Sequence, residues 1–209
     1  MEIAVICVLK SGGDYDATYV EKMRNMVLRN ATVPFKFYCL TDIEVECDKI
    51  PLKDNLKGWW SKIEIFRPDL VKEKRIIYFD LDTVIVGNID EYLLEDADFV
   101  ALGALSKNKK RNSFGSGFMS WKNNYQFCFL YDDFSIYLAG KFRGDQDYIH
   151  AKLLSEDKDF TTWQKKHEGV YSYKWDCINS LPSKAKIVCF HGKPRPTDVN
   201  VNWVNKNWK

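Results

Sequence analysis

The stretch Ile76-Ile77-Tyr78-Phe79-Asp80-Leu81-Asp82-Thr83 decides the fold of this chain. Four large apolar residues run directly into two aspartates that are two positions apart. An apolar run of this kind that ends in charged residues is typical of a buried strand. In an open α/β sheet, ligands bind outside the carboxyl ends of the strands. We therefore expect an α/β fold with a ligand site at Asp80 and Asp82.

The composition is that of an ordinary globular protein. Of the 209 residues, 45% are apolar and 29% are charged, with 11 glycines and 6 prolines, which excludes a disordered or fibrous chain. The length is typical of a single domain, so we expect one domain over residues 1–209. The net charge of +2 gives no strong attraction to nucleic acid, and we interpret the basic run at 107–111 as a solvated loop.

The cysteines and the hydropathy indicate the compartment. The six cysteines form no C-x-x-C pair, and several fall within apolar runs, where a free thiol behaves as a small apolar side chain. This pattern favours a reducing environment. No signal peptide opens the chain, and no apolar stretch approaches the roughly 18 residues that a membrane span needs. We expect a cytoplasmic protein without a membrane span.

Apolar periodicity predicts further strands and helices on both sides of the opening stretch. The expected strands cover residues 3–9, 34–40, 75–79, 83–86, 99–102, 115–121 and 187–190. The expected helices begin near Asp14 and cover 58–66, 125–137 and 145–154. The first strand and helix, joined by a glycine turn, fit the start of a nucleotide-binding unit, although most glycine pairs of this kind are only turns.

Two strand ends carry the expected chemistry. Asp80 and Asp82 suit Mg²⁺ or Mn²⁺, because these hard cations take carboxylate oxygens and leave positions open for phosphate. His191 follows the last apolar strand, and an imidazole can complete a metal site with carboxylates. Gly192 permits a close backbone approach, and Lys193 supplies positive charge for a diphosphate. A solvated acidic loop and a structural histidine are the alternatives.

Three segments resemble a known family when they are taken together in chain order. Asp80-Leu81-Asp82, Gly144-Asp145-Gln146-Asp147 and Phe190-His191-Gly192-Lys193-Pro194 are similar to motifs of metal-dependent GT-A glycosyltransferases, especially the family 8 type. Further stretches resemble small glycosyltransferase-like proteins of bacteria and large DNA viruses, and a viral protein would act in the host cytoplasm. The resemblance implies a single GT-A domain with a mixed, mostly parallel sheet flanked by helices. Its nucleotide-binding part would cover about 1–86 and its donor and acceptor part about 87–209.

The resemblance also implies roles for individual residues. Asp80, Asp82 and His191 would bind Mn²⁺ or Mg²⁺, and the partners would be a UDP-sugar donor and a carbohydrate or glycoprotein acceptor. The implied contacts to the nucleotide-sugar come from Leu9, Lys10, Asp42, Lys62, Leu81, Gly192 and Lys193. The implied catalytic residues are Asp145, Gln146 and Asp147. Family 8 similarity favours retention of the anomeric configuration, whereas an inverting enzyme would use Asp145 or Asp147 as the base.

Two other functions fit parts of the same sequence. A strand followed by Asp80-x-Asp82 also matches the opening motif of haloacid-dehalogenase-like phosphatases, in which the first aspartate is a nucleophile. Strands precede the motif here, and no later acidic pair stands at a strand end to complete that site. A nucleotide-sugar-binding module without catalytic activity is the second alternative.

Overall fold

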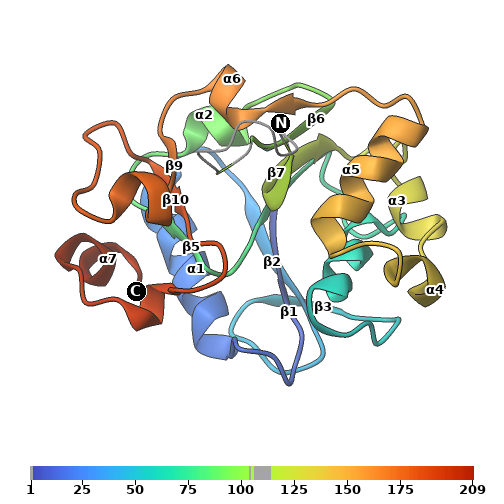
Figure 1. The fold of residues 1–209 in the computed structure, drawn as a ribbon, viewed down its shortest axis with the longest axis horizontal. Helices are drawn as coiled ribbons and strands as arrows, with labels where there is room; N and C mark the ends of the chain where they lie inside the picture. Colours follow the sequence, from blue (N-terminus) through green and yellow to red (C-terminus); the bar gives the residue numbers. More distant parts are fainter. Residues whose placement is uncertain (1, 104, 106–113) are drawn as a thin grey trace.

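A seven-stranded sheet forms the centre of the protein (Figure 1). The structure is a computed structural model that describes residues 2–103, 105 and 114–209, so the basic run at 107–111 lies outside the described residues. The strands are β1 (Ile3–Leu9), β2 (Lys36–Thr41), β3 (Asp48–Pro51), β4 (Arg75–Phe79), β6 (Phe99–Leu102), β7 (Gly115–Lys122) and β8 (Thr161–Thr162). Their order is β3-β2-β1-β4-β7-β6-β8, and β7 alone runs antiparallel to its neighbours. The predicted α/β fold with a mixed, mostly parallel sheet is confirmed.

Side chains of the central strands alternate between two apolar layers. In β1, Val5 and Cys7 belong to one core cluster, whereas Ala4 and Ile6 belong to the other. This alternation follows from the two-residue period of a strand whose two faces are both covered. The helices that cover the sheet are α1 (Ala17–Asn30), η1 (Gly58–Phe66), α2 (Asp90–Leu93), α3 (Phe129–Asp132), α4 (Ile136–Ala139), α5 (Asp145–Ser155), α6 (Trp163–Lys166) and α7 (Asn202–Asn207).

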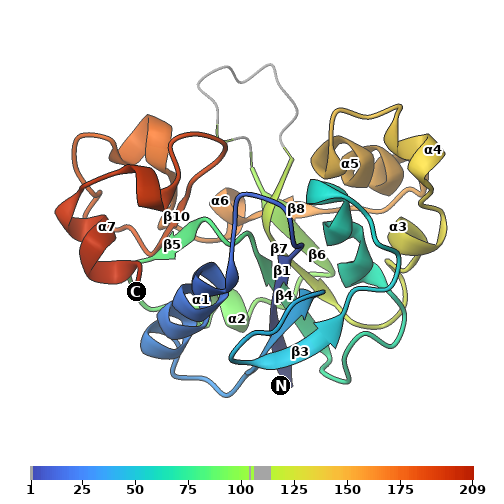
Figure 2. The ribbon, with the colours of Figure 1, turned by 90° about the horizontal axis from the view of Figure 1, so that it is seen from below.

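The helices divide between the two sides of the sheet. In Figures 1 and 2, α1 and α7 lie on one side, while α3, α4 and α5 lie on the other. Helix α1 begins after Asp16, whose side chain accepts a hydrogen bond from the Thr18 amide and so caps the helix. The 3₁₀ helix η1 packs with α3 and α5, and it carries Lys62 into the space at the carboxyl end of β4.

A second sheet places the C-terminal half of the chain beside the aspartates. It consists of β5 (Thr83–Ile85), β10 (Ile187–Cys189) and β9 (Val170–Ser172), with β10 in the middle. Strand β5 begins directly after Asp82, and β10 pairs with it in antiparallel orientation. Strands β9 and β10 are parallel, so both end at the same edge. The residues that follow them, 173–177 (η2, a π-helical turn at Tyr173–Cys177) and His191, are thereby neighbours.

Most predicted elements are present, with local differences. The strands at 3–9, 75–79 and 99–102 have the predicted bounds. The single helix predicted over 125–137 is wrong, because this segment forms the two short helices α3 and α4. Ser135 separates them, since it adopts an extended conformation and its side chain caps α4 by accepting a hydrogen bond from the Leu138 amide. Among the described residues, each helix is too short or too polar to span a bilayer.

Candidate active site

A cavity of about 960 Å³ lies at the carboxyl ends of β1 and β4. Its volume is near the upper end of the range, roughly 300–1,000 Å³, that is usual for small-molecule sites. Strand β7 completes the wall, because it runs antiparallel to β4 and so begins where β4 ends. The small sheet contributes the opposite wall through His191 and Lys174. The cavity is therefore enclosed by elements from both halves of the chain.

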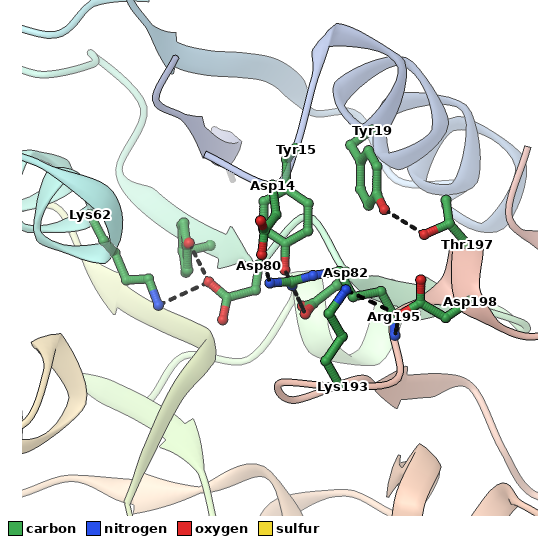
Figure 3. Close-up of polar contacts among 11 residues, drawn as sticks. Asp14, Tyr15, Tyr19, Lys62, Asp80, Asp82, Lys193, Arg195, Thr197 and Asp198 are labelled. Atoms are coloured by element: carbon green, nitrogen blue, oxygen red, sulfur yellow. Dashed lines mark hydrogen bonds and ion pairs between the residues drawn. The ribbon is translucent and has the colours of Figure 1, made fainter. Parts of the chain in front are cut away.

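Asp80 is held by a buried network on the side of η1 and α5. The Lys62 ammonium lies 2.9 Å from Asp80 Oδ1 and 2.9 Å from Asp145 Oδ2 (Figure 3 shows the first contact). The Ser116 hydroxyl donates a hydrogen bond of 2.6 Å to Asp145, and the Tyr78 hydroxyl donates one to Asp80. Burial opposes a charge on Lys62, but the carboxylates of Asp145 and Asp80 raise its pKa above the usual value. Lys62 is thus a fixed cation between two carboxylates.

The backbone of β7 approaches Asp80 closely. The Asp80 amide donates a hydrogen bond of 2.8 Å to the Gly117 carbonyl. A Cβ atom at Gly117 would lie 3.0 Å from Asp80 Oδ2, which is closer than ordinary van der Waals contact. The absence of a side chain at Gly117 therefore leaves the Asp80 carboxylate the space that it occupies.

Asp82 is held from the other side, by Tyr15 and Arg195 (Figure 3). Its side chain is buried, and it accepts a hydrogen bond of 2.8 Å from the Tyr15 hydroxyl. The Arg195 guanidinium lies 3.4 Å from the same carboxylate, stacks 4.4 Å from the Tyr15 ring and pairs with Asp14 at 2.5 Å. Burial and the neighbouring Asp80 charge raise the pKa of Asp82 to about 7. The site thus places two carboxylates close together, with a cation on each flank.

His191 lies at the end of β10 and faces the same cavity. Its Nε2 atom is 2.8 Å from Ser172 Oγ at the end of β9. Burial, together with the nearby Lys174 charge, lowers the pKa of His191 below its usual value. The imidazole is therefore neutral near pH 7, which is the form that binds metal ions.

The first two strand ends form a separate polar cluster. The Asp42 carboxylate pairs with the Lys10 ammonium, and it accepts hydrogen bonds from the Ser11 amide at 2.8 Å and the Ser11 hydroxyl at 2.6 Å. Burial opposes the charge on Asp42, but the hydrogen bonds from Lys10 and Ser11 lower its pKa below the usual range. Lys10 also donates a hydrogen bond of 3.0 Å to Asn55. Asp42 thus fixes the loop that carries Lys10 into the cavity.

Side chains of the types that bind a divalent cation are present, although they are not gathered around one point. Two carboxylates and a neutral imidazole are suitable ligands for Mn²⁺ or Mg²⁺. Within the described residues, however, no three His, Cys, Asp or Glu side chains form a group that could hold a metal ion as they stand. Asp80, Asp82 and His191 instead contact Lys62, Arg195 and Ser172. Metal binding by all three would require them to exchange these partners.

The structure brings most of the predicted site residues to one cavity. The predicted residues that line it are Leu9, Lys10, Lys62, Asp80, Leu81, Asp82, Asp145, Gln146, His191 and Gly192. Three others are not among its lining residues. Asp42 contacts Lys10, which lines the cavity, and its neighbour Ser11. Asp147 pairs with Arg143 at 2.6 Å, and the Lys193 side chain is 72% exposed and lies 3.5 Å from Asp198.

Sequence reasoning missed several residues that line the cavity. They are Tyr15, Trp59, Tyr78, Lys174, Trp175 and Arg195. Trp59 is 60% exposed, whereas its neighbour Trp60 packs against Phe134 and Tyr148. Tyr78 was assigned to the core, and its ring is buried as expected while its hydroxyl reaches Asp80. A cation soon after a strand was the available signal for Lys174, but strand β9 itself was not recognised.

The fold is shared with the glycosyltransferase GlyE of Streptococcus pneumoniae TIGR4. The apo form of GlyE aligns with a TM-score of 0.63 and 18% identity over 94% of this chain and 56% of that one. A second GlyE structure gives 0.64 and 16% identity over 92% and 56%. This chain therefore spans little more than half the length of GlyE. No protein-family model matches the chain, and no curated protein matches it.

Proposed function

We propose that this chain is a glycosyltransferase that moves a sugar from a UDP-sugar to a hydroxyl group of a carbohydrate or glycoprotein acceptor. One observation carries the proposal: Asp80 and Asp82 stand together at the end of β4 and line a cavity of about 960 Å³. The carboxyl ends of parallel strands are where open α/β folds bind nucleotides. The fold that the chain shares with GlyE supports the same assignment.

In this proposal, Asp80, Asp82 and His191 bind Mn²⁺ or Mg²⁺. A divalent cation held by these residues would supply positive charge to the diphosphate of the donor. The raised pKa of Asp82 supports a cation site, because a buried carboxylate beside another carboxylate gains from added positive charge. Lys62 pairs with Asp80 and Arg195 with Asp82, so each carboxylate has its own cationic partner.

The remaining predicted residues surround the donor. Leu9 and Lys10 line the cavity and in this proposal contact the uridine, with Asp42 holding Lys10 in place. Leu81 and Gly192 contribute to the diphosphate region, and Lys193 is the cation that the resemblance implies there. Lys62, Asp145 and Gln146 also line the cavity, and in this proposal they surround the sugar.

The reaction exchanges one bond at the anomeric carbon of the sugar. Its bond to the β-phosphate oxygen breaks, and the electron pair leaves with UDP. The acceptor oxygen forms the new bond and loses its proton to a base. Of the two carboxylates predicted as a base, Asp145 lines the cavity and Asp147 does not. Asp145 is therefore our candidate base if the configuration inverts, although the family resemblance favours retention.

A screen of UDP-sugars in the presence of Mn²⁺ tests this proposal. The wild-type protein is expected to release UDP from at least one donor, slowly with water and faster with a carbohydrate acceptor. Asp80→Asn should lower this rate by at least about 100-fold, because it weakens both the metal site and the contact to Lys62. An absence of turnover with every donor and acceptor, together with UDP binding, would instead support the binding module.

The phosphatase alternative is tested with a generic phosphoester. A phosphatase of the haloacid-dehalogenase type would hydrolyse it and lose that activity in Asp80→Asn. The glycosyltransferase proposal expects no such hydrolysis.

A further inference from the structure

Lys174 is a cation of the cavity that sequence reasoning did not single out. It lies in the π-helical turn η2, two residues after β9, and its side chain lines the cavity. A Cβ atom placed on Gly192 would lie 3.5 Å from the Lys174 ammonium. The ammonium therefore lies next to the backbone of Gly192, the residue after His191, which has no side chain at this point.

The other cations of the cavity already have carboxylate partners. Lys10 pairs with Asp42, Lys62 with Asp80 and Asp145, and Arg195 with Asp14 and Asp82. Among the described residues, by contrast, Lys174 has no carboxylate within ion-pair distance. Lys174 is partly buried and carries a charge that no carboxylate of the described residues pairs with. An anionic ligand in the cavity would therefore stabilise it.

The surroundings of Lys174 suit a phosphate group. Lys174 and His191 both line the cavity, and Ser172, two residues before Lys174, lies 2.8 Å from His191 Nε2, so the two residues face one region of the cavity. Gly192 adopts a left-handed conformation with φ of +67°, and it adds no side chain to this region. Because Gly192 has no side chain, a phosphate group has room to approach the Lys174 ammonium. Lysine binds phosphate as a point charge.

Lys193 differs from Lys174 in each of these respects. Its side chain is 72% exposed, it lies 3.5 Å from Asp198, and it is not among the residues that line the cavity (Figure 3 shows this pair). A lysine that is exposed and already paired contributes less binding free energy to a bound phosphate, because solvent screens its charge.

We propose that Lys174, whose ammonium lies beside the backbone of Gly192, is the cavity cation that binds the diphosphate of the donor. This inference rests on the proposed function, and it assigns to Lys174 the role that the resemblance implies for Lys193. The neighbouring Ser172 hydroxyl contacts His191 and accepts a hydrogen bond from the Trp175 amide at the start of η2, so the strand end positions Lys174 and His191 together.

Calorimetric titration of the full chain with UDP, in buffer with Mg²⁺, tests the inference. Lys174→Met is expected to weaken UDP binding about tenfold or more and to leave the affinity for uridine unchanged. Lys174→Arg should recover most of the loss. Lys184→Met is the matched control, because Lys184 is exposed and pairs with Glu168 at the surface. Lys193→Met should lose less affinity than Lys174→Met.

Two results would overturn the inference. One is a UDP affinity of Lys174→Met that equals that of Lys184→Met. The other is an equal loss of UDP and uridine affinity, which would mean that Lys174 does not contact phosphate. If Lys174→Met fails to fold, Lys174→Gln replaces it, since the amide keeps a polar group at this half-buried position.

Inorganic pyrophosphate separates this inference from the proposed function. Pyrophosphate needs no uridine pocket, so its binding reports on the anion subsite alone. If the wild type binds pyrophosphate in a Lys174-dependent manner but binds no UDP, the nucleotide assignment is wrong and the anion subsite stands. If the wild type binds neither compound, both proposals are wrong.

Discussion

Lys62 is the residue on which the geometry of the cavity most depends. It is 7% exposed and is the common partner of Asp80 and Asp145. Removing one partner of a buried ion pair leaves the other charge unpaired in a poorly solvated place. Lys62→Met should therefore lower the free energy of unfolding by about 3–5 kcal/mol, measured by urea denaturation.

The surface pair of Lys184 and Glu168 provides the control for that experiment. Both side chains are largely exposed, so Lys184→Met should change the free energy of unfolding by less than about 1 kcal/mol. Equal effects of Lys62→Met and Lys184→Met would contradict the view that Lys62 holds the network together.

Gly117 gives a second test at the scale of one residue. An added Cβ would lie 3.0 Å from Asp80 Oδ2 and so displace that carboxylate by a few tenths of an ångström. We expect Gly117→Ala to reduce sugar-donor turnover about tenfold, because small misplacements of catalytic groups are costly. Gly140→Ala is the control, since its nearest neighbour, the Tyr137 carbonyl, is 3.6 Å from the added atom. Unchanged turnover in Gly117→Ala would show that the position of Asp80 tolerates this shift.

Single residues also show where sequence reasoning succeeds and where it fails. Asp80, Asp82 and His191 were identified because each follows an apolar strand directly, and they do line one cavity. Arg195 was missed because its role depends on contacts between distant segments. It reaches Asp14 and Asp82 from the far end of the chain. No local pattern encodes such contacts.

Secondary-structure elements were predicted best where apolar runs are long. Strands β1 and β4 are buried on both faces, and their bounds match the prediction. Strand β3 was missed because it is a short, polar edge strand, and β9 because three residues carry too little periodicity. Since β9 supports η2, the missed strand explains why Lys174 was not predicted to lie near the site.

The connection between α1 and α2 gives a prediction at the scale of elements. Asp90, at the start of α2, accepts hydrogen bonds from the Thr32 amide at 2.7 Å and the Val33 amide at 3.3 Å. Burial opposes its charge, but hydrogen bonds from Thr32 and Asn88 lower the pKa of Asp90 to about 2. A lowered pKa means that the stabilisation is present above the unfolded pKa near 4 and is lost as pH falls through 2.

Replacing Asp90 should therefore have a pH-dependent effect. At pH 7, Asp90→Asn should lower the free energy of unfolding by about 1 kcal/mol, and this difference should vanish near pH 2. Urea denaturation at pH 7, 4 and 2 measures it, with Asp159→Asn at an exposed position as the control. A difference that stays constant over this pH range would contradict the role given to the Asp90 charge.

At the scale of the whole molecule, the two sheets together form the site. The large sheet supplies Asp80 and Lys10, and the small sheet supplies Lys174 and His191. The α/β class followed from the sequence because alternating strands and helices are local patterns. The small sheet did not, since β5 and β10 are about a hundred residues apart and pair only in the folded chain. The predicted boundary at about residue 86 between a nucleotide-binding part and a donor and acceptor part stays a prediction; it falls just after β5.

The central claim is that Asp80 and Asp82 hold a divalent cation that binds the donor diphosphate. Calorimetric measurement of the UDP dissociation constant, with and without Mn²⁺, tests it most directly in the wild type, Asp80→Asn and Asp82→Asn. We predict that Mn²⁺ tightens UDP binding by at least about tenfold in the wild type and has no effect in either variant. An equal Mn²⁺ effect in all three proteins, or none in the wild type, would contradict the claim.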